Sequence, residues 1–184
     1  MSSVYGSYYM MNVPLVMTVI GRDRPGLVGL LADVVGAHDG NWLESRMCHL
    51  GGEFAGILRV HVPQDQESSL VQNLKALEKQ GLSCQIRPDP SAQPPAATPS
   101  TILEIVGQDR PGIIRQISSA LSRHGINVEE LTSECGSAPM TGEILFRATI
   151  KLHIPESCPM APLREELEKI AADLMVDVQI APAP

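Results

Sequence analysis

The chain has 184 residues, and its 14 Lys and Arg against 21 Asp and Glu give a net charge of −7. Because this balance is acidic and the basic residues are scattered, the composition argues against direct binding to nucleic acid. No apolar run approaches the ~20 residues of a membrane-spanning helix, and residues 1–12 lack the basic and apolar regions of a signal peptide. We therefore expect a cytoplasmic chain with reduced cysteines and no membrane contact.

The most informative feature of the sequence is an internal repeat. The segment Gly21–Gly26 (Gly-Arg-Asp-Arg-Pro-Gly) returns 86 positions later as Gly107–Gly112 (Gly-Gln-Asp-Arg-Pro-Gly). The correspondence extends along both halves of the chain, and its offset grows only at loops, which tolerate insertions. A repeat of this length indicates two copies of one domain, which we place at residues 13–88 and 100–182.

Two segments lie outside these copies. Residues 89–99 are expected to form a linker, because five prolines between residues 87 and 99 favour a semi-rigid, extended chain. Residues 1–12 hold all three tyrosines but show no periodicity. We expect this head to be either poorly ordered or docked on the surface.

The first copy begins with a strand followed by a helix. Leu15–Ile20 is mostly apolar and indicates a buried strand. Apolar residues then recur at helical spacing over Leu27–Val35. Because proline is favoured in the first turn of a helix, this pattern predicts a helix that begins close to Pro25 and ends near His38.

A cap and a hairpin are predicted on either side of this helix. We expect the Asp23 carboxylate to cap the helix by accepting from the backbone N–H of Gly26 or Leu27. After the helix, Trp42–Leu50 reads as a second strand. Gly51–Gly52 then permits a tight hairpin, since both residues can adopt a positive φ.

The rest of the domain is clearest in the second copy. Alternating apolar and polar residues over Phe146–Ile154 predict a third strand with its apolar side toward the core. Leu163, Leu167 and Ile170 predict a second helix, and a short strand near Val176–Ala181 closes the copy. The order β-α-β-β-α-β predicts an α+β, ferredoxin-like fold in each copy: a four-stranded antiparallel sheet with two helices on one face. The other face is either solvated or covered by a partner.

Little in the sequence points to catalysis or to a metal. No nucleophile stands beside a plausible base, so we expect a non-enzymatic protein without a cofactor. Cys48, His49 and Cys135 are too few and too irregularly spaced for zinc, which needs three or four converging ligands. His38 and His124 fall at helix ends, where a structural role is favoured.

Three features together resemble the ACT domain, the small regulatory module of amino-acid metabolism. They are the β-α-β-β-α-β order, the Asp-Arg-Pro-Gly turn after the first strand, and a His-x-x-Asn segment at His38–Asn41 and His124–Asn127. Two such domains with no catalytic or DNA-binding domain attached resemble the glycine cleavage system transcriptional repressor family. Similar turns also lead ACT domains in formyltetrahydrofolate deformylases, uridylyltransferases and phosphoserine phosphatases.

The resemblance implies a regulator that binds a small amino acid, with glycine as the first choice. It implies control of gene expression in amino-acid metabolism through a protein partner, which is a transcription regulator or an enzyme. It also implies pairing of ACT units, within the chain or in a homodimer. Two alternatives stay open: a protein-interaction module that needs no ligand, and an accessory regulatory subunit of a metabolic enzyme.

The resemblance also suggests where a ligand binds. In ACT domains that bind amino acids, the ligand sits at an interface between domains, against the turn and the start of the first helix. Free N–H groups there suit the ligand carboxylate, and an Asn at the start of the second strand, expected nearby, suits its ammonium. The alternative is that the turn only caps the helix. The residues assigned in this way are Asp23, Arg24, Pro25, Gly26, Leu27 and Asn41 in the first copy, and Asp109, Arg110, Pro111, Gly112, Ile113 and Asn127 in the second.

Overall fold

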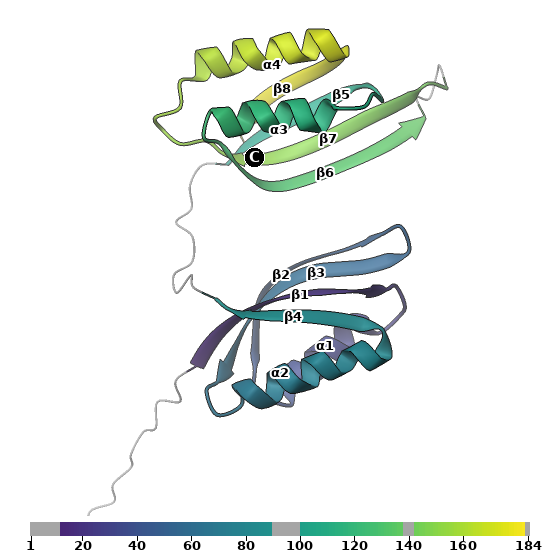
Figure 1. Cartoon of the computed structure of the whole chain (residues 1–184), viewed down its shortest axis with the longest axis vertical. Helices are drawn as coiled ribbons and strands as arrows, with labels where there is room; N and C mark the ends of the chain where they lie inside the picture. Colours follow the sequence, from purple (N-terminus) through teal and green to yellow (C-terminus); the bar gives the residue numbers. More distant parts are fainter. Residues whose placement is uncertain (1–11, 90–99, 138–141, 183–184) are drawn as a thin grey trace, which may run out of the picture. The chain divides into compact units, whose positions relative to one another are not determined.

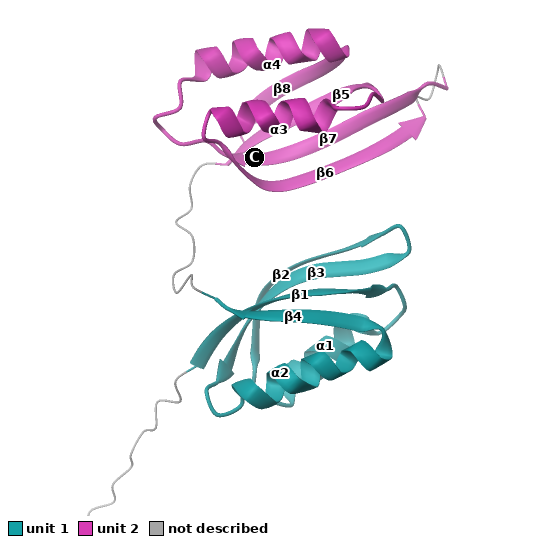
Figure 2. Ribbon diagram, in the orientation of Figure 1, with its two compact units in different colours: residues 1–94 teal, residues 95–184 magenta. Residues whose placement is uncertain are grey.

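A computed structural model describes residues 12–89, 100–137 and 142–182 of the chain. These residues fall into two compact units, divided between Pro94 and Pro95 (Figure 2). The expected head and linker lie outside the described residues, apart from Asn12 and Asp89. Asn12 belongs to the first strand, and the buried Asp89 donates its backbone N–H to the carbonyl oxygen of Pro14 at 2.9 Å.

Both units have the predicted element order and the predicted sheet (Figure 1). The strands of each sheet pair antiparallel, in the order β2-β3-β1-β4 in the first unit and β6-β7-β5-β8 in the second. Two helices cover one face of each sheet, which confirms the ferredoxin-like prediction. The first unit consists of β1 (Asn12–Arg22), α1 (Leu27–Gly36), β2 (Asn41–Leu50), β3 (Glu53–Pro63), α2 (Glu67–Ala76) with a 3-10 turn at Leu77–Gln80, and β4 (Leu82–Pro88). The second consists of β5 (Thr101–Gln108), α3 (Ile113–Arg123), β6 (Asn127–Ser137), β7 (Ile144–His153), α4 (Met160–Leu174) and β8 (Val176–Pro182).

Each unit has its own aliphatic core between sheet and helices. In β7 the alternation is as predicted, since Ile150 and Leu152 are 1% and 0% exposed, whereas Thr149 is exposed and Lys151 is half-buried. Leu31 of α1 and Leu70 of α2 are 0% exposed and pack against the first sheet. Burial of each such side chain contributes about 1.5–3 kcal/mol, so these contacts hold helices and sheet together.

The start of α1 differs from the sequence expectation. Gly26 occupies the cap position with a left-handed φ of 93°, and no side chain bonds to the helix N-terminus. The expectation that Asp23 caps the helix is therefore wrong, because Asp23 lies three residues before the cap position. Its backbone N–H instead donates to the carbonyl oxygen of Gly52 at 3.0 Å and ties the turn to the β2–β3 hairpin. The hairpin itself is as predicted, with φ of 61° at Gly51 and 83° at Gly52.

The first glycine of each repeated segment is required by a close backbone approach. A Cβ at Gly21 would lie 2.3 Å from the carbonyl oxygen of Gly81, which immediately precedes β4. A Cβ at Gly107 would lie 2.7 Å from the carbonyl oxygen of Met175, which immediately precedes β8. In both units this contact sets where the end of the first strand meets the start of the last.

Two glycines of the first unit are predicted to respond in opposite ways to replacement by Ala. Gly29 lies inside α1, and the position that a methyl group would take there has nothing within 4 Å. Gly29→Ala should therefore raise the free energy of unfolding by about 0.5–1 kcal/mol through helix propensity. Gly21→Ala should lower it by about 1–3 kcal/mol through overpacking. Urea denaturation followed by Trp42 fluorescence measures both, and equal midpoints for the two variants would contradict the close approach.

Candidate functional site

Each Asp-Arg-Pro-Gly turn leads into a helix whose N-terminus has no side-chain cap. Gly26 and Gly112 have left-handed φ values of 93° and 98°. Their carbonyl oxygens accept the first helical hydrogen bonds, from the N–H of Leu30 and Gln116, both at 2.9 Å. The N–H groups of the three residues between glycine and donor therefore have no acceptor within the helix. Together with the helix dipole, these groups form an environment that favours an anion.

The arginines of the two turns hold the turns in place. Arg24 Nη2 donates to the carbonyl oxygen of Gln80 at 3.2 Å. Arg110 Nη2 donates to Gln108 Oε1 at 3.1 Å and lies 3.8 Å from Met175 Sδ. Both side chains thus reach toward the segment that precedes the last strand of their unit. A guanidinium has five N–H donors, so each arginine retains donors for a further acceptor.

The aspartates of the turns face the end of the neighbouring hairpin. Asp23 Oδ2 lies 3.7 Å from His49 Nε2. Asp109 occupies the same place beside Cys135, whose pKa is raised by desolvation, by the Asp109 charge and by a hydrogen bond to Asp109. The Cys135 thiol therefore stays protonated. No group of three or more His, Cys, Asp and Glu that could hold a metal ion is found among the described residues.

The two asparagines lie far from the turns of their own units. Asn41 pairs with His61 at one end of the first sheet, whereas the turn lies at the other end, beside Leu50. β2 runs from Asn41 to Leu50 between these two ends, a span of ~30 Å at ~3.3 Å per residue. Asn127 pairs with His153 in the same way. The expectation that the asparagine lies near the turn within one copy is therefore wrong, because the helix returns the chain to the opposite end of the sheet before the second strand starts.

The turns of the two units differ in the side chains beside them. Apart from its own chain neighbours, no described residue lies within 4 Å of a Cβ position at Gly26. At Gly112, Arg115 Nη2 and Gln116 Nε2 each lie 3.9 Å from that position. The corresponding residues of the first unit, 86 positions earlier, are Gly29 and Leu30, which carry no polar side chain. The second turn therefore has side-chain donors that the first lacks.

A repeated histidine joins the two helices of each unit, a contact that the sequence pattern did not predict. In the first unit, His38 is only 7% exposed and its Nδ1 donates to the carbonyl oxygen of Val34 at 2.8 Å. That carbonyl can only accept, so Nδ1 carries a proton; the Asn73 amide nitrogen can only donate, so Nε2 accepts from Asn73 Nδ2 at 3.0 Å and from Ser69 Oγ at 3.1 Å. His38 is thus a neutral acceptor between α1 and α2.

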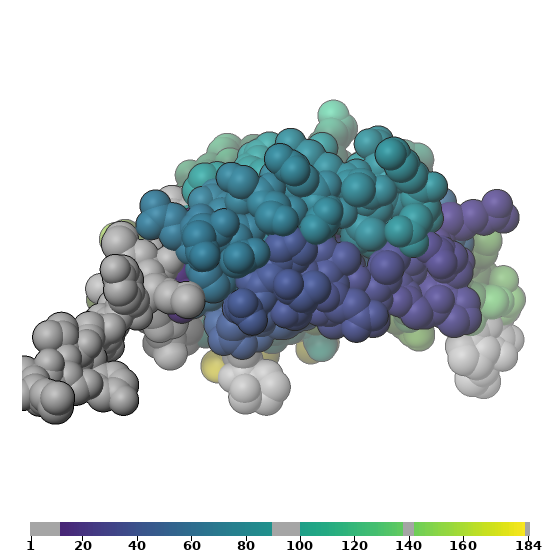
Figure 3. Space-filling model, turned by 90° about the horizontal axis from the view of Figure 1, so that it is seen from below, coloured from purple at the N-terminus to yellow at the C-terminus, as the bar shows by residue number. Residues whose placement is uncertain are grey.

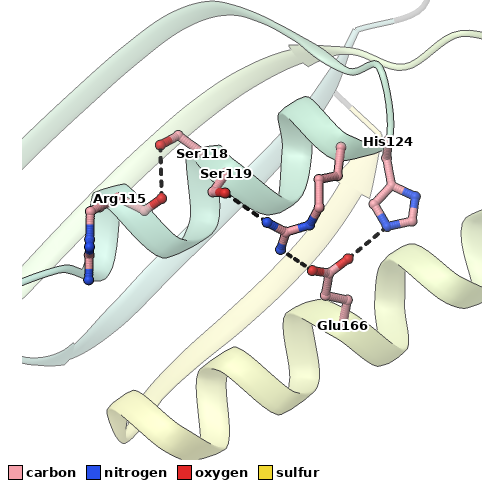
Figure 4. Close-up of polar contacts among 6 residues, drawn as sticks. Arg115, Ser118, Ser119, His124 and Glu166 are labelled. Atoms are coloured by element: carbon pink, nitrogen blue, oxygen red, sulfur yellow. Dashed lines mark hydrogen bonds and ion pairs between the residues drawn. The ribbon is translucent and has the colours of Figure 1, made fainter.

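The second unit builds the same bridge with charged groups (Figure 4). His124 Nε2 lies 2.9 Å from Glu166 Oε2, and Arg123 pairs with the other oxygen of the same carboxylate. Hydrogen bonds from Arg123 and then from His124 hold the pKa of Glu166 below its ordinary value of 4.5. Glu166 corresponds to Asn73, 93 positions earlier. The signal was therefore present in the sequence, as a histidine repeated with a polar residue at a matched position of the second helix.

These units match a known domain family. ACT-domain family profiles match residues 13–87 and residues 101–151. The chain is a tandem ACT-domain protein. It is 27% identical over 164 residues to the glycine cleavage system transcriptional repressor of Escherichia coli (strain K12), a match that covers 87% of this chain and 85% of the relative. The chain is thus a regulatory ACT-domain protein related to that repressor.

Solved structures share the tandem architecture. A protein of unknown function from Galdieria sulphuraria matches with a TM-score of 0.80 and 25% identity, over 95% of this chain and 100% of the other. A crystal structure assigned to the glycine cleavage system transcriptional repressor matches with a TM-score of 0.68 and 19% identity, over 94% and 98% of the two chains. At that identity the second match supports the fold alone. No helix in the described part of the chain is long and apolar enough to cross a membrane.

The charged bridge predicts acid sensitivity of the second unit. Because the pKa of Glu166 is lowered in the folded state, its stabilisation is fully present above the ordinary carboxyl value of 4.5 and is lost as pH falls through the lower, folded value. Glu166→Gln removes this dependence, so the stability of the variant should fall less between pH 5 and pH 3. Amide hydrogen exchange of α4 measures the change. The control is Glu165→Gln on the same helix, and identical pH profiles for the two variants would contradict the role of Glu166.

The neutral bridge predicts one tautomer of His38. Since Nδ1 donates to Val34 and Nε2 accepts from two donors, the Nδ1–H form should predominate at pH 8. The ¹⁵N chemical shifts of the imidazole ring distinguish the two tautomers directly. His124, whose Nε2 faces a carboxylate, should show the opposite preference. The same tautomer at both histidines would contradict the difference between the two bridges.

Proposed function

We propose that this protein is a non-enzymatic regulator that binds a small amino acid, glycine first, at its Asp-Arg-Pro-Gly turns. It acts in the cytoplasm and controls gene expression of amino-acid metabolism through a protein partner. The observation that carries this proposal is the duplicated helix N-terminus without a side-chain cap, behind a left-handed glycine. Free N–H groups and space beside the glycine suit a carboxylate. The name of the Escherichia coli relative, a transcriptional repressor, supports a role in gene expression.

The proposed site needs two ACT units. A turn and an asparagine of the same unit are ~30 Å apart along the sheet, so no single small ligand contacts both. A ligand whose carboxylate binds a turn and whose ammonium binds Asn41 or Asn127 must therefore lie where the turn of one unit meets the asparagine end of another. Binding then stabilises that pairing of units, within one chain or between two chains. A partner protein then recognises the change in how the units pair.

A second candidate function rests on β6. Every residue of this edge strand is exposed, and among the described residues no strand pairs with the outer side of its backbone. Exposed edges of this kind bind an additional strand from a partner protein. This feature favours the protein-interaction module that needs no ligand, and the experiment below separates it from the sensor.

Amino-acid binding is predicted to depend on the glycines of the turns. Gly26→Ala combined with Gly112→Ala should abolish calorimetric binding of glycine or of whichever member of an amino-acid panel binds, because a methyl group at each turn obstructs the ligand. Gly125→Ala is the control, since Gly125 also has a positive φ, lies at the other end of α3 and has open space around it. Placing Ala at the positive φ of this position costs about 1–2 kcal/mol of stability through strain, as it does at Gly26 and Gly112.

The asparagines provide the test of the paired site. Asn41→Ala combined with Asn127→Ala should weaken the same binding, although both residues lie far from the turns of their own units. Far-UV circular dichroism establishes that each variant is folded. Unchanged affinity in the glycine variant overturns the turn site, and unchanged affinity in the asparagine variant overturns the paired arrangement. No binding by the wild type to any amino acid favours the ligand-independent module.

A further inference from the structure

A groove runs between the two helices of the second unit, on the side away from the sheet. Its volume is about 460 Å³, a size that accommodates a small metabolite. The floor contains Ile170, but most of the lining is polar or charged. The residues that matter for its chemistry are Arg115, Ser119 and Arg123 of α3 and Glu166, Lys169 and Asp173 of α4.

The groove concentrates positive charge on an acidic unit. Residues 100–182 contain seven Lys and Arg against twelve Asp and Glu. Three of those seven cations line this one groove, together with two carboxylates. Charges of one sign gathered in a hollow raise the local potential and attract counter-ions of the opposite sign. With the Arg123–Glu166 pair set aside, two cations and one carboxylate line the groove, so its charge is positive on a unit that is acidic overall.

One end of the groove is already neutralised. Arg123 Nη1 donates to Ser119 Oγ at 2.7 Å, and its other terminal nitrogen pairs with Glu166 (Figure 4). In the remainder of the groove, the Arg115 guanidinium and the Lys169 ammonium have no hydrogen bond or ion pair within the described part of the chain, although the Arg115 backbone carbonyl accepts from Ser118 Oγ at 3.3 Å. Two cations thus line a common hollow without forming an ion pair, and Asp173 is the carboxylate of that hollow that Arg123 does not engage. Ser119 accepts from Arg123 but retains its own hydroxyl proton to donate.

The first unit has no equivalent of this arrangement, although it has the same fold. The positions that correspond to Arg115 and Arg123, 86 residues earlier, are Gly29 and Ala37. The position that corresponds to Lys169, 93 residues earlier, is Ala76. α1 and α2 lie side by side on the helical face of that unit (Figure 3) and are joined by the neutral His38 bridge. The cations of the second groove are therefore not needed to pack two helices on an ACT sheet.

We propose that the groove between α3 and α4 binds a small metabolite through an anionic oxygen group, a carboxylate or a phosphate. Arg115 and Lys169 hold the anion, and the hydroxyl of Ser119 and the amide of Gln116 donate to it. Asp173, which lines the same groove, accepts from an amino or hydroxyl group of the ligand. The groove adjoins the second turn, since Arg115 Nη2 and Gln116 Nε2 each lie 3.9 Å from the Cβ position at Gly112. It differs from the turn site of the proposed function because it lies between two helices and exists in one unit only.

The test is an NMR titration of the full chain with sodium phosphate and, separately, with sodium malonate, at an ionic strength kept constant with chloride. Saturable shifts of the Ser119 amide and of the Arg115 and Arg123 side-chain N–H signals are expected with at least one probe. The probe that binds more tightly identifies the anion class. Arg115→Ser and Lys169→Ser should each weaken binding about tenfold, which corresponds to the loss of one charge-assisted contact.

The control is Arg147→Ser, which removes the same charge from the outer face of the same sheet and should leave affinity unchanged. Shifts that do not saturate, or equal weakening by Arg147→Ser, show non-specific screening and overturn the proposal. If neither probe binds to the folded wild-type protein, the proposal is also overturned. Gly26→Ala separates the two sites, since it should abolish amino-acid binding at the turn of the first unit while phosphate or malonate binding in the groove of the second unit persists.

Discussion

The geometry of both units depends on one close contact between two backbone segments. At Gly21 the chain of β1 passes so near the residue before β4 that a single added carbon would lie 2.3 Å from a carbonyl oxygen. Gly107 stands in the same relation to the residue before β8. This contact brings the end of the central strand against the start of the edge strand, and the Asp-Arg-Pro-Gly turn leaves the sheet at that point. The direction of the following helix, and the exposure of its first N–H groups, follow from it.

The two units join their helices through the same histidine position but with different chemical groups. A histidine after the first helix must contact the second helix, and in the first unit it does so as a neutral acceptor among Ser69 and Asn73. In the second unit a carboxylate replaces the amide, and an arginine joins the bridge. The change leaves the aliphatic cores intact, since no residue of either bridge belongs to a core. Duplication thus separates the residues that build the fold from those that are free to take on another role.

Local patterns in the sequence were sufficient for the fold, and insufficient for the site. The alternation in β7, the helical spacing in α1 and the Gly51–Gly52 hairpin each depend on residues close together in the chain, so periodicity identifies them. The place of Asn41 depends instead on how α1 returns the chain across the sheet, and no local pattern carries that information. The prediction that Asp23 caps the helix was wrong for a related reason. The Gly52 carbonyl of the hairpin accepts the Asp23 backbone N–H and holds the turn in another position. The His38 bridge was missed because its partners lie more than thirty residues away on another helix.

Each ACT unit has two chemically different ends, a turn end and an asparagine end, and this polarity limits how units combine. When two units pair by a two-fold axis, any arrangement that sets the turn of one against the asparagine of the other does so twice, because the axis repeats the contact. If each of these contacts holds the proposed ligand, ligands bind in pairs, and the first one bound aligns the units for the second. Such an assembly can respond steeply to ligand concentration although no single unit changes shape.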